Sequence, residues 1–378
     1  METFVTIERA LSIVRQTPIP FTTEMVSLNR AHNRILSENL QSKVDDPRFD
    51  NSAMDGWAVR SGDDERIEVG VTAAGEAATE VRPGEAIRIM TGAPVPKGAD
   101  SIVMVEDGIN GKAHTNFIRK RGENLRKGET TLQAGQIMTP SAISLAATMG
   151  HETVPVRSQP RIAVISTGDE LIQPGHELKE GQIYESNSYG LCALLEKIGC
   201  TPVHHNVVED SIDGLRNALN SVDCDAILTS GGVSMGEFDF VRKLMEDEGN
   251  LHFWKVAMRP GGPPLFGTWN GTPLFGLPGN PVSSHLVFTT IVAPWLAPET
   301  PLVKEVRVRM KDPVKGAPGK VCLRRIHIST EGEELIGTTH THQGSGNIHS
   351  LVAHNGVTYL PPDTGANAGD VVNALWFH

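Results

Sequence analysis

The sequence is poor in cysteine, in aromatic residues and in long apolar runs. Its 378 residues include four cysteines, Cys192, Cys200, Cys224 and Cys322, and none of them forms a CxxC pair. This usage fits a reduced, cytoplasmic protein better than a disulfide-stabilised secreted one. No apolar run is long enough to span a membrane, and the opening residues METFVTIERALSIVRQ mix charged with apolar positions, unlike a signal peptide.

Positive charge is also scarce, because the formal net charge is -11. This balance argues against a general nucleic-acid binder and against a protein that attaches to membrane surfaces. An anionic substrate would therefore need a local group of cations or a bound metal ion. The 38 glycines and 24 prolines, with only 5% aromatic residues, predict many turns and loops.

The apolar pattern changes several times along the chain and indicates a multidomain α/β plus β protein. Amphipathic spacing predicts helices near residues 6–16 and 30–40, and short β-like runs broken by Gly and Pro fill 66–140. Strand and helix alternate over 160–297, which predicts a mostly parallel sheet covered on both faces. The alternating strands after Pro298 suggest a small C-terminal β barrel or sandwich.

Three glycine-containing loops follow apolar strands of the α/β region: STGDEL (166–171), TSGGVSMGEFD (229–239) and GLPGNPVSS (276–284). Loops at the carboxyl ends of parallel strands expose backbone N–H groups that bind phosphate or another oxyanion. One such loop is equally well explained as a tight turn, but three after successive strands favour a ligand site. The expected contacts are Ser166, Thr167, Gly168, Ser230, Gly231, Gly232, Ser234, Pro278, Gly279 and Asn280.

The same loops carry carboxylates, which repel a phosphate unless a cation lies between them. Glu170, Asp210 and Asp239 are the candidate ligands for Mg²⁺, which is usually held by one or two carboxylates, waters and phosphate oxygens. The alternative interpretation makes Asp210 and Asp239 helix caps and Glu170 an ordinary surface residue. Capping and metal contact do not exclude each other.

Positive charge is expected from FWKVAMRPGGPPLFG, residues 253–267. Lys255 and Arg259 are four positions apart on a strand-like run, so regular alternation would place both side chains on one face. They could hold a phosphate or another oxyanion, with Arg259 offering a bidentate fork. The alternative is a solvated pair on an edge strand.

Seven motifs occur in an order that resembles one family, the molybdopterin molybdenumtransferases (MoeA), related to the E domains of gephyrin and of a plant counterpart. These motifs are FDNSAMDGWAV, RIMTGAPVP, RGENLRKGE, ISTGDEL, SGGVSMGEFDF, FWKVAMRPGGP and FGLPGNPVSS. The resemblance spans nearly the whole chain and implies four domains. They would be an elongated linker domain (1–43 and 128–157), an inserted small β domain (44–127), the molybdopterin-binding α/β domain (158–297) and a C-terminal β barrel (298–378).

The resemblance also implies an activity, the last step of molybdenum cofactor synthesis. The substrates would be molybdate and adenylated molybdopterin; the phosphoanhydride is cleaved, molybdenum enters the dithiolene and AMP leaves. Such enzymes are similar in needing Mg²⁺ and in forming homodimers whose cleft lies between the α/β domain of one subunit and the small β domain of its partner. A molybdopterin adenylyltransferase would supply the substrate, and no nucleic acid or membrane is expected as a partner.

Functional positions carried over by motif are Asp55, Thr91, Glu170, Asp210, Asp239, Lys255 and Arg259. Arg259 stands where the family often has lysine, Gly262 replaces a second frequent lysine, and Thr130 lies near the place of an acid that LRKGETT lacks. Two alternatives from other classes are an adenylyltransferase-like pterin-binding protein and a non-catalytic scaffold of the gephyrin kind. AMP release triggered by molybdate would separate the three.

Overall fold

The computed structural model describes residues 1–233, 239–339 and 342–377, and the chain divides into two compact units. Unit 1 contains Met1–Phe21 and Gln159–His378, and unit 2 contains Thr22–Ser158. The expected linker segment 1–43 is therefore split, because residues 1–21 join the α/β region. In the described residues, no helix is both long and apolar enough to cross a membrane.

Unit 1 is built on a seven-stranded sheet in which every neighbouring pair is parallel except the two pairs made by β20. In spatial order the strands are β1 (Glu2–Val5), β18 (Asn250–Val256), β20 (Leu265–Trp269), β21 (Thr272–Leu277), β17 (Ala226–Ser230), β13 (Arg161–Ser166) and β16 (Thr201–His204). The apolar runs at β13, β17 and β21 are buried almost throughout, as strands covered on both faces must be. The predicted mostly parallel sheet is confirmed.

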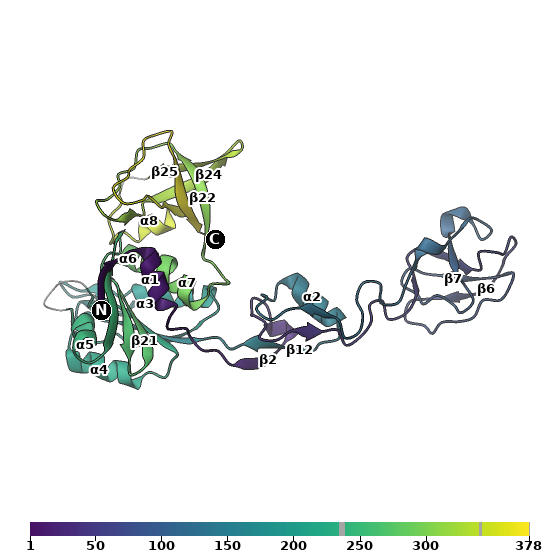
Figure 1. Cartoon of the computed structure of the whole chain (residues 1–378), viewed down its shortest axis with the longest axis horizontal. Coiled ribbons are helices and arrows are strands. Elements are labelled where there is room, and N and C mark those ends of the chain that lie inside the picture. The colour runs from purple at the N-terminus through teal and green to yellow at the C-terminus, as the bar shows by residue number, and fades with distance from the viewer. Residues whose placement is uncertain (234–238, 340–341, 378) are drawn as a thin grey trace. The chain divides into compact units, whose positions relative to one another are not determined.

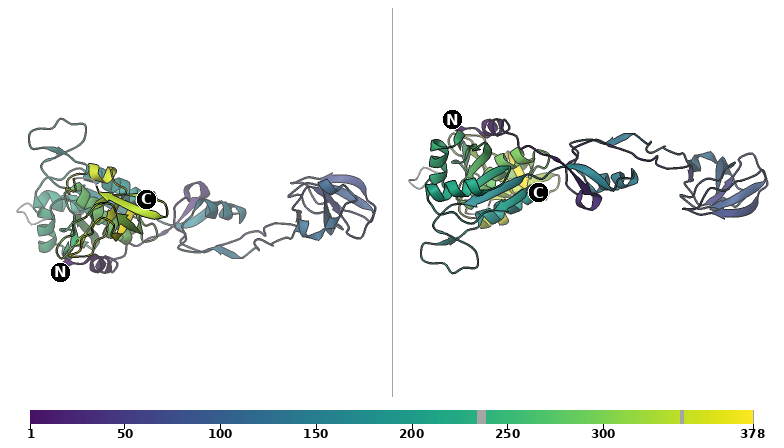
Figure 2. Two further views of the ribbon diagram at one scale, coloured as in Figure 1. Left: turned by 90° about the horizontal axis from the view of Figure 1, so that it is seen from above. Right: turned by 90° about the horizontal axis from the view of Figure 1, so that it is seen from below.

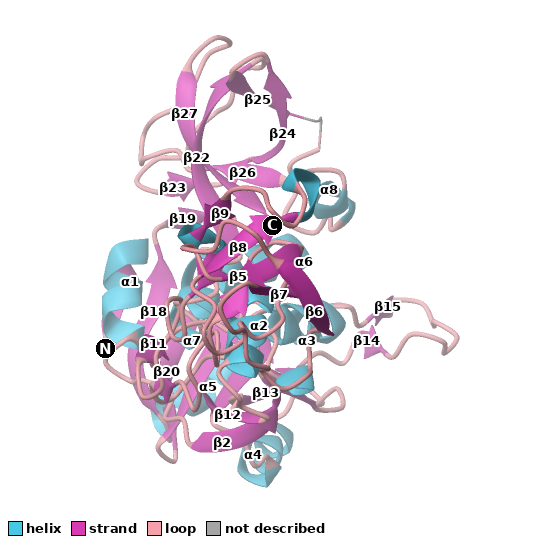
Figure 3. Ribbon diagram, turned by 90° about the vertical axis from the view of Figure 1, so that its right-hand side faces the viewer, coloured by secondary structure: helices cyan, strands magenta, loops and turns pink. Residues whose placement is uncertain are grey.

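Helices cover both faces of this sheet (Figures 1 and 3). One core contains side chains of α1 (Ile7–Val14), α3 (Asn187–Lys197) and α6 (Pro281–Val287), the last continuing through a π-helical turn, Phe288–Val292, into α7 (Ala293–Leu296). The second core contains those of α4 (Ile212–Ser221) and α5 (Phe240–Asp247). Pro281 is the first residue of α6, and the Ser211 side chain caps α4.

The carboxyl ends of the three central strands lie level with one another. Ser166 of β13 pairs with Ser230 of β17, and Ser230 pairs with Leu277 of β21. The three glycine-containing loops therefore start at one edge of the sheet. A short parallel pair, β14 (Leu171–Ile172) and β15 (Ile183–Tyr184), follows the first loop, and the segment between them projects from the body of unit 1 (Figures 2 and 3).

The C-terminal region of unit 1 is a closed five-stranded barrel, as predicted. Its strands in order are β22 (Val303–Met310), β25 (Glu334–Thr339), β24 (Arg325–Glu331), β26 (Gly356–Thr358) and β27 (Val371–Phe377), with α8 (His349–Val352) beside them. The barrel packs directly on the α/β region, because Leu323, Val357 and Leu375 belong to the same core as α1 and α6. A further link is β23 (Val321–Cys322), which pairs with β19 (Met258–Arg259).

Unit 2 contains three small cores. The first joins β2 (Thr23–Ser27) with β12 (Thr153–Arg157), β3 (Leu40–Gln41) with β11 (Thr130–Leu132), and α2 (Pro140–Thr148). The others lie on a five-stranded sheet of β6 (Ile67–Thr72), β7 (Glu85–Ile89), β5 (Gly56–Val59), β8 (Ser101–Met104) and β9 (Ala113–His114). Smaller elements are β4 (Asn51–Ser52) with β10 (Ile118–Arg119), and 3₁₀ turns at Leu28–Arg30, Val105–Asp107 and Thr115–Phe117.

The helix predicted near residues 30–40 is wrong. Only the 3₁₀ turn Leu28–Arg30 forms, Asn33 takes a left-handed conformation, and Leu36 bridges to Val156. Pairing with distant strands has overridden the local apolar spacing. The helix of this unit is instead α2, whose signals are the Thr139 cap and Pro140 at the first helical position.

Candidate functional site

A pocket of about 630 Å³ opens at the edge of the sheet where the three loops begin. We call it the acidic pocket, because Glu170, Glu185, Asp210 and Asp239 line it and no Lys or Arg does among the described residues. The loop residues expected at a ligand and present in its wall are Thr167, Gly168, Ser230, Gly231, Gly232, Pro278, Gly279 and Asn280. Ser166 lies behind the wall, and Ser234 falls outside the described residues.

Glycine keeps this wall open at Gly168 and Gly231. Gly231 has φ +102°, and a Cβ there would lie 2.7 Å from the carbonyl oxygen of Thr167. At Gly168 a Cβ would lie 2.7 Å from a Glu170 carboxylate oxygen. A side chain at Gly231 would therefore strain the backbone and crowd the first loop, whereas one at Gly168 would meet the movable end of Glu170 in its own loop.

The carboxylates of the acidic pocket influence one another. Burial raises the pKa of Asp210, and the nearby charges of Asp169, Glu170 and Asp239 raise it further. A hydrogen bond from the Asp169 backbone to the Asp210 carboxylate lowers this pKa, but only partly offsets the rise. The Asp210 N–H in turn donates to Asp169 Oδ1 at 3.0 Å. Folding thus concentrates negative charge that a cation would neutralise.

Two of these acids were also candidates for helix caps. Ser211, not Asp210, caps α4 through a hydrogen bond from the Gly214 N–H. Asp239 does occupy the N-cap position of α5, without a side-chain capping bond to the described residues. The cap interpretation therefore does not account for Asp210.

The donor set fits a hard cation such as Mg²⁺, which prefers carboxylate oxygens and keeps part of its coordination for water and phosphate. Within the described ranges no three His, Cys, Asp or Glu residues converge closely enough to form a complete cage.

Two residues that sequence reasoning missed organise the acidic pocket. Glu185 is 1% exposed and accepts hydrogen bonds from Ser166 Oγ at 3.0 Å and the Ser188 N–H at 2.8 Å. Asn187 Nδ2 donates to Ser230 Oγ and to the Gly279 carbonyl, each at 2.8 Å, and so ties the second loop to the third. The sequence does show an acid, Glu185, just before a helix, which could have marked it as a candidate. No local pattern shows that residues 184–188 (YESNS) contact the two other loops.

A second pocket, of about 730 Å³, shares Pro263 with the acidic pocket. We call it the cationic pocket, because Lys255, Arg259, Lys320 and Arg324 line it and no carboxylate does among the described residues. Lys320 and Arg324 precede β24 of the barrel, so unit 1 assembles this pocket from segments far apart in the sequence. The acids and the cations thus lie in adjoining pockets rather than in one.

Lys255 and Arg259 line the same pocket. They do not reach it through the regular alternation of one continuous strand. Lys255 has φ +69°, β18 ends at Val256, and the chain pairs again only at Met258–Arg259. The Lys255 ammonium lies 3.9 Å from the centre of the Trp254 ring. The left-handed residue changes the alternation, which a pattern of apolar residues cannot reveal.

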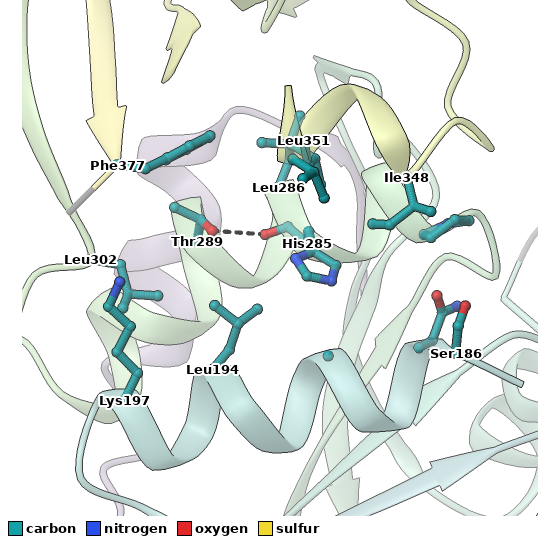
Figure 4. A pocket seen from close by; sticks show the side chains of 14 residues that line it. Ser186, Leu194, Lys197, His285, Leu286, Thr289, Leu302, Ile348, Leu351 and Phe377 are labelled. Carbon is teal, nitrogen blue, oxygen red and sulfur yellow. Dashed lines mark hydrogen bonds between the residues drawn. The ribbon is translucent and has the colours of Figure 1, made fainter. Parts of the chain in front are cut away.

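A third pocket, of about 420 Å³, is largely apolar and lies between α3, α6 and the barrel (Figure 4). It shares Ser186, Asn187, Pro281 and Ile348 with the acidic pocket. Burial lowers the pKa of His285, whose ring points between α6 and α3 in Figure 4. No local pattern in the sequence indicates this space.

Unit 2 brings Asp55 and Thr91 together. The Thr91 N–H and hydroxyl donate to Asp55 Oδ1 at 2.7 and 3.0 Å, and these bonds hold the pKa of Asp55 below its usual range. A Cβ at Gly56 would lie 1.8 Å from the Val103 carbonyl oxygen, which explains the glycine of the MDG motif. Thr130, at the start of β11, pairs with Gln41 in the backbone.

Three descriptions of known families match successive parts of the chain. They are the MoeA N-terminal region (domain I and II) at residues 5–150, the probable molybdopterin binding domain at 163–298 and the MoeA C-terminal region (domain IV) at 307–377. The acidic pocket is built mainly from the second, with Gly346 and Ile348 from the third. The chain belongs to the molybdopterin molybdenumtransferase family.

Curated relatives and solved structures agree with this assignment. Molybdopterin molybdenumtransferase 2 of Mycobacterium tuberculosis is 34% identical over 382 residues, covering 93% of this chain and 94% of the relative. The Haemophilus influenzae molybdopterin molybdenumtransferase is 38% identical over 310 residues, covering 77% of each chain. A crystal structure of the MoeA protein of Pyrococcus horikoshii superposes with a TM-score of 0.84 at 28% identity, covering 99% of both chains.

Proposed function

We propose that this chain inserts molybdenum into adenylated molybdopterin, releasing AMP, in the cytoplasm, as the last step of molybdenum cofactor synthesis. The proposal is supported mainly by one observation: the acidic pocket and the cationic pocket adjoin each other and share Pro263. The reaction has two anionic participants, a phosphoanhydride and molybdate. One pocket suits a phosphate that arrives with a cation, and the other suits an oxyanion held directly by Lys and Arg.

One or two of the candidate ligands Glu170, Asp210 and Asp239 would hold Mg²⁺ in the acidic pocket. Mg²⁺ would neutralise the phosphate oxygens and stabilise the charge that builds up as the phosphoanhydride is cleaved. Burial, and after it the charges of neighbouring carboxylates, raise the pKa of Asp210. A bound cation would offset the repulsive part of this effect, which supports the proposed role.

The residues of the chain then have separable roles. Backbone N–H groups around Gly231 and Gly279 bind the phosphate oxygens, and Lys255 and Arg259 bind molybdate. An oxygen of water or of molybdate attacks one phosphorus, the P–O bond to the bridging oxygen breaks, and AMP leaves. When molybdate binds the dithiolene, two Mo–S bonds form and one molybdate oxygen leaves as water with the two thiol protons, so molybdenum keeps its oxidation state.

The experiment is to load the purified protein with adenylated molybdopterin and measure AMP after adding molybdate, with Mg²⁺ or with a chelator. The proposal expects AMP release that requires both molybdate and the metal, and that Asp210→Asn and Arg259→Ala each reduce. Release without either addition contradicts it. An adenylyltransferase would instead consume ATP, and a scaffold would do neither.

We also propose that the chain works as a homodimer and receives its substrate from a molybdopterin adenylyltransferase. The Asp55–Thr91 pair supports the first point, because these residues belong to the motifs carried over from the family yet lie in unit 2. Asp55→Ala and Asp210→Ala proteins, each inactive alone, are expected to recover activity when mixed under conditions that exchange subunits. Failure to recover, in a sample shown by light scattering to contain mixed dimers, opposes a shared site.

A further inference from the structure

Phe4 combines a strained backbone with an exposed aromatic ring. It lies in β1, an edge strand of the large sheet, with φ +57°, a region that a phenylalanine rarely adopts. Its side chain is among those that line the cationic pocket, yet the residue is 49% exposed. A half-exposed ring adds little to the core, so its burial alone does not explain why this conformation is retained.

The residue opposite Phe4 is strained in the same way. The register of β1 and β18 pairs Thr3 with Trp254 and Val5 with Val256, which leaves Phe4 beside Lys255, and Lys255 has φ +69°. Val5 and Val256 are both buried in the sheet's core, whereas Phe4 and Lys255 both line the cationic pocket. Two neighbouring left-handed residues, one aromatic and one cationic, thus lie in the wall of the same pocket.

The surroundings of Phe4 suit a flat, negatively charged ligand. Four cations, Lys255, Arg259, Lys320 and Arg324, line the pocket without a carboxylate among its described residues. The Lys320 ammonium is 5.7 Å from the centre of the Phe4 ring, near the outer limit of a cation–π contact, so that contact does little to fix the ring. A phenyl face beside a group of cations is complementary to a planar ring that carries an oxyanion.

We propose that Phe4 is a stacking surface for the planar fused heterocycle of the substrate, a pterin or a purine, which lies beside the molybdate that the cations hold. This inference rests on the proposed function, which assigns oxyanion binding to the cationic pocket. It adds a contact that determines specificity: the pocket binds a flat ring through Phe4 in addition to the oxyanion bound by the cations. Phe4 and the cations make separate contributions, so substitutions can separate them.

Calorimetric titration with three probes, molybdate, AMP and 6-hydroxymethylpterin, tests the proposal on the full-length protein. Phe4→Asn removes the ring while keeping a residue that tolerates positive φ, and Phe4→Trp keeps an aromatic face. Phe21→Ala is the matched control, because Phe21 is 50% exposed and does not line the cationic pocket. Thermal unfolding of each variant shows whether it is folded.

Phe4→Asn is expected to weaken binding of one ring probe by roughly 5- to 150-fold, the range found when a stacked aromatic is lost. Molybdate binding should be unchanged, and Phe4→Trp should bind the ring as the unmodified protein does. The probe that is weakened identifies the ring as a purine or a pterin. Phe21→Ala should bind all three probes normally.

The proposal is overturned if Phe4→Asn binds both ring probes with normal affinity, or if the unmodified protein binds neither. It is also overturned if Phe4→Asn or Phe4→Trp loses molybdate and ring probes equally, because Phe4 would then only shape the pocket. Failure of the proposed function looks different: molybdate would not bind, or Arg259→Ala would leave its binding unchanged, while the ring probes still report on Phe4.

Discussion

The geometry of the second loop makes a quantitative prediction for Gly231→Ala. Any L-residue at φ +102° pays for a backbone conformation that it rarely adopts, and here its Cβ would also lie 2.7 Å from the Thr167 carbonyl oxygen. The conformational cost is about 1–2 kcal/mol, and crowding of this kind typically adds about 1–3 kcal/mol. The substitution is therefore expected to reduce the free energy of unfolding by about 2–5 kcal/mol.

Gly175→Ala provides the matched control. Gly175 has φ +95°, almost the same conformation, but nothing lies within 4 Å of the position that its Cβ would take. Only the conformational cost of about 1–2 kcal/mol should then appear. The difference between the two variants isolates the contact between the second loop and Thr167.

Urea unfolding of both variants measures the two free energies, and AMP release after molybdate addition measures activity. Gly231→Ala is expected to be less stable than Gly175→Ala and to lose activity even where it is fully folded, because the methyl group intrudes on the wall of the acidic pocket. Gly175→Ala should release AMP at the normal rate. Equal destabilisation by the two substitutions would refute the reasoning, since it would mean that the loop relaxes away from Thr167 at no cost.

Three further predictions follow from the charges and the thiols. Asp210→Asn should stabilise the apo-protein at neutral pH, because the raised pKa of Asp210 means that folding disfavours its charged form. In urea titrations across pH, this gain in the free energy of unfolding should disappear as the pH falls through the raised pKa toward 3.8. AMP release should be lost in the same variant. Gly262→Lys should be tolerated, because a Cβ there would meet only backbone oxygens at 3.5 and 3.8 Å. The added charge should tighten molybdate binding several-fold in calorimetry. Weaker binding would contradict the assignment of molybdate to the cationic pocket. Burial raises the pKa of Cys192 to about 11 and that of Cys200 to about 12. Both thiols should therefore react with iodoacetamide at pH 8 far more slowly in the native protein than in urea. Equal reaction rates would contradict their burial.

The sequence was sufficient to predict those strands and helix starts whose own residues mark them. The buried strands β13, β17 and β21 are short apolar runs followed by glycine, and Pro281 and Ser211 mark helix starts by their chemistry. Because parallel strands end at one edge of a sheet, these local signals also predicted which loops would meet.

Other features depend on long-range pairing that no local pattern contains. The expected helix near residues 30–40 does not form, because residues of this segment pair with distant strands, as in the bridge between Leu36 and Val156. Lys320 and Arg324 reach the cationic pocket only because the barrel region packs on the α/β region through the β19–β23 pair. Regular alternation also does not describe Lys255, because its left-handed conformation, which the sequence does not reveal, interrupts the strand pattern.

A crystal structure of the protein soaked with AMP, Mg²⁺ and molybdate tests the central claim most directly. The account predicts the AMP phosphate against the backbone of Gly231 and Gly279, Mg²⁺ on at least one of Glu170, Asp210 and Asp239, and molybdate beside Lys255 and Arg259. Density for the phosphate and the metal elsewhere on the molecule, with both pockets filled only by water, would contradict it.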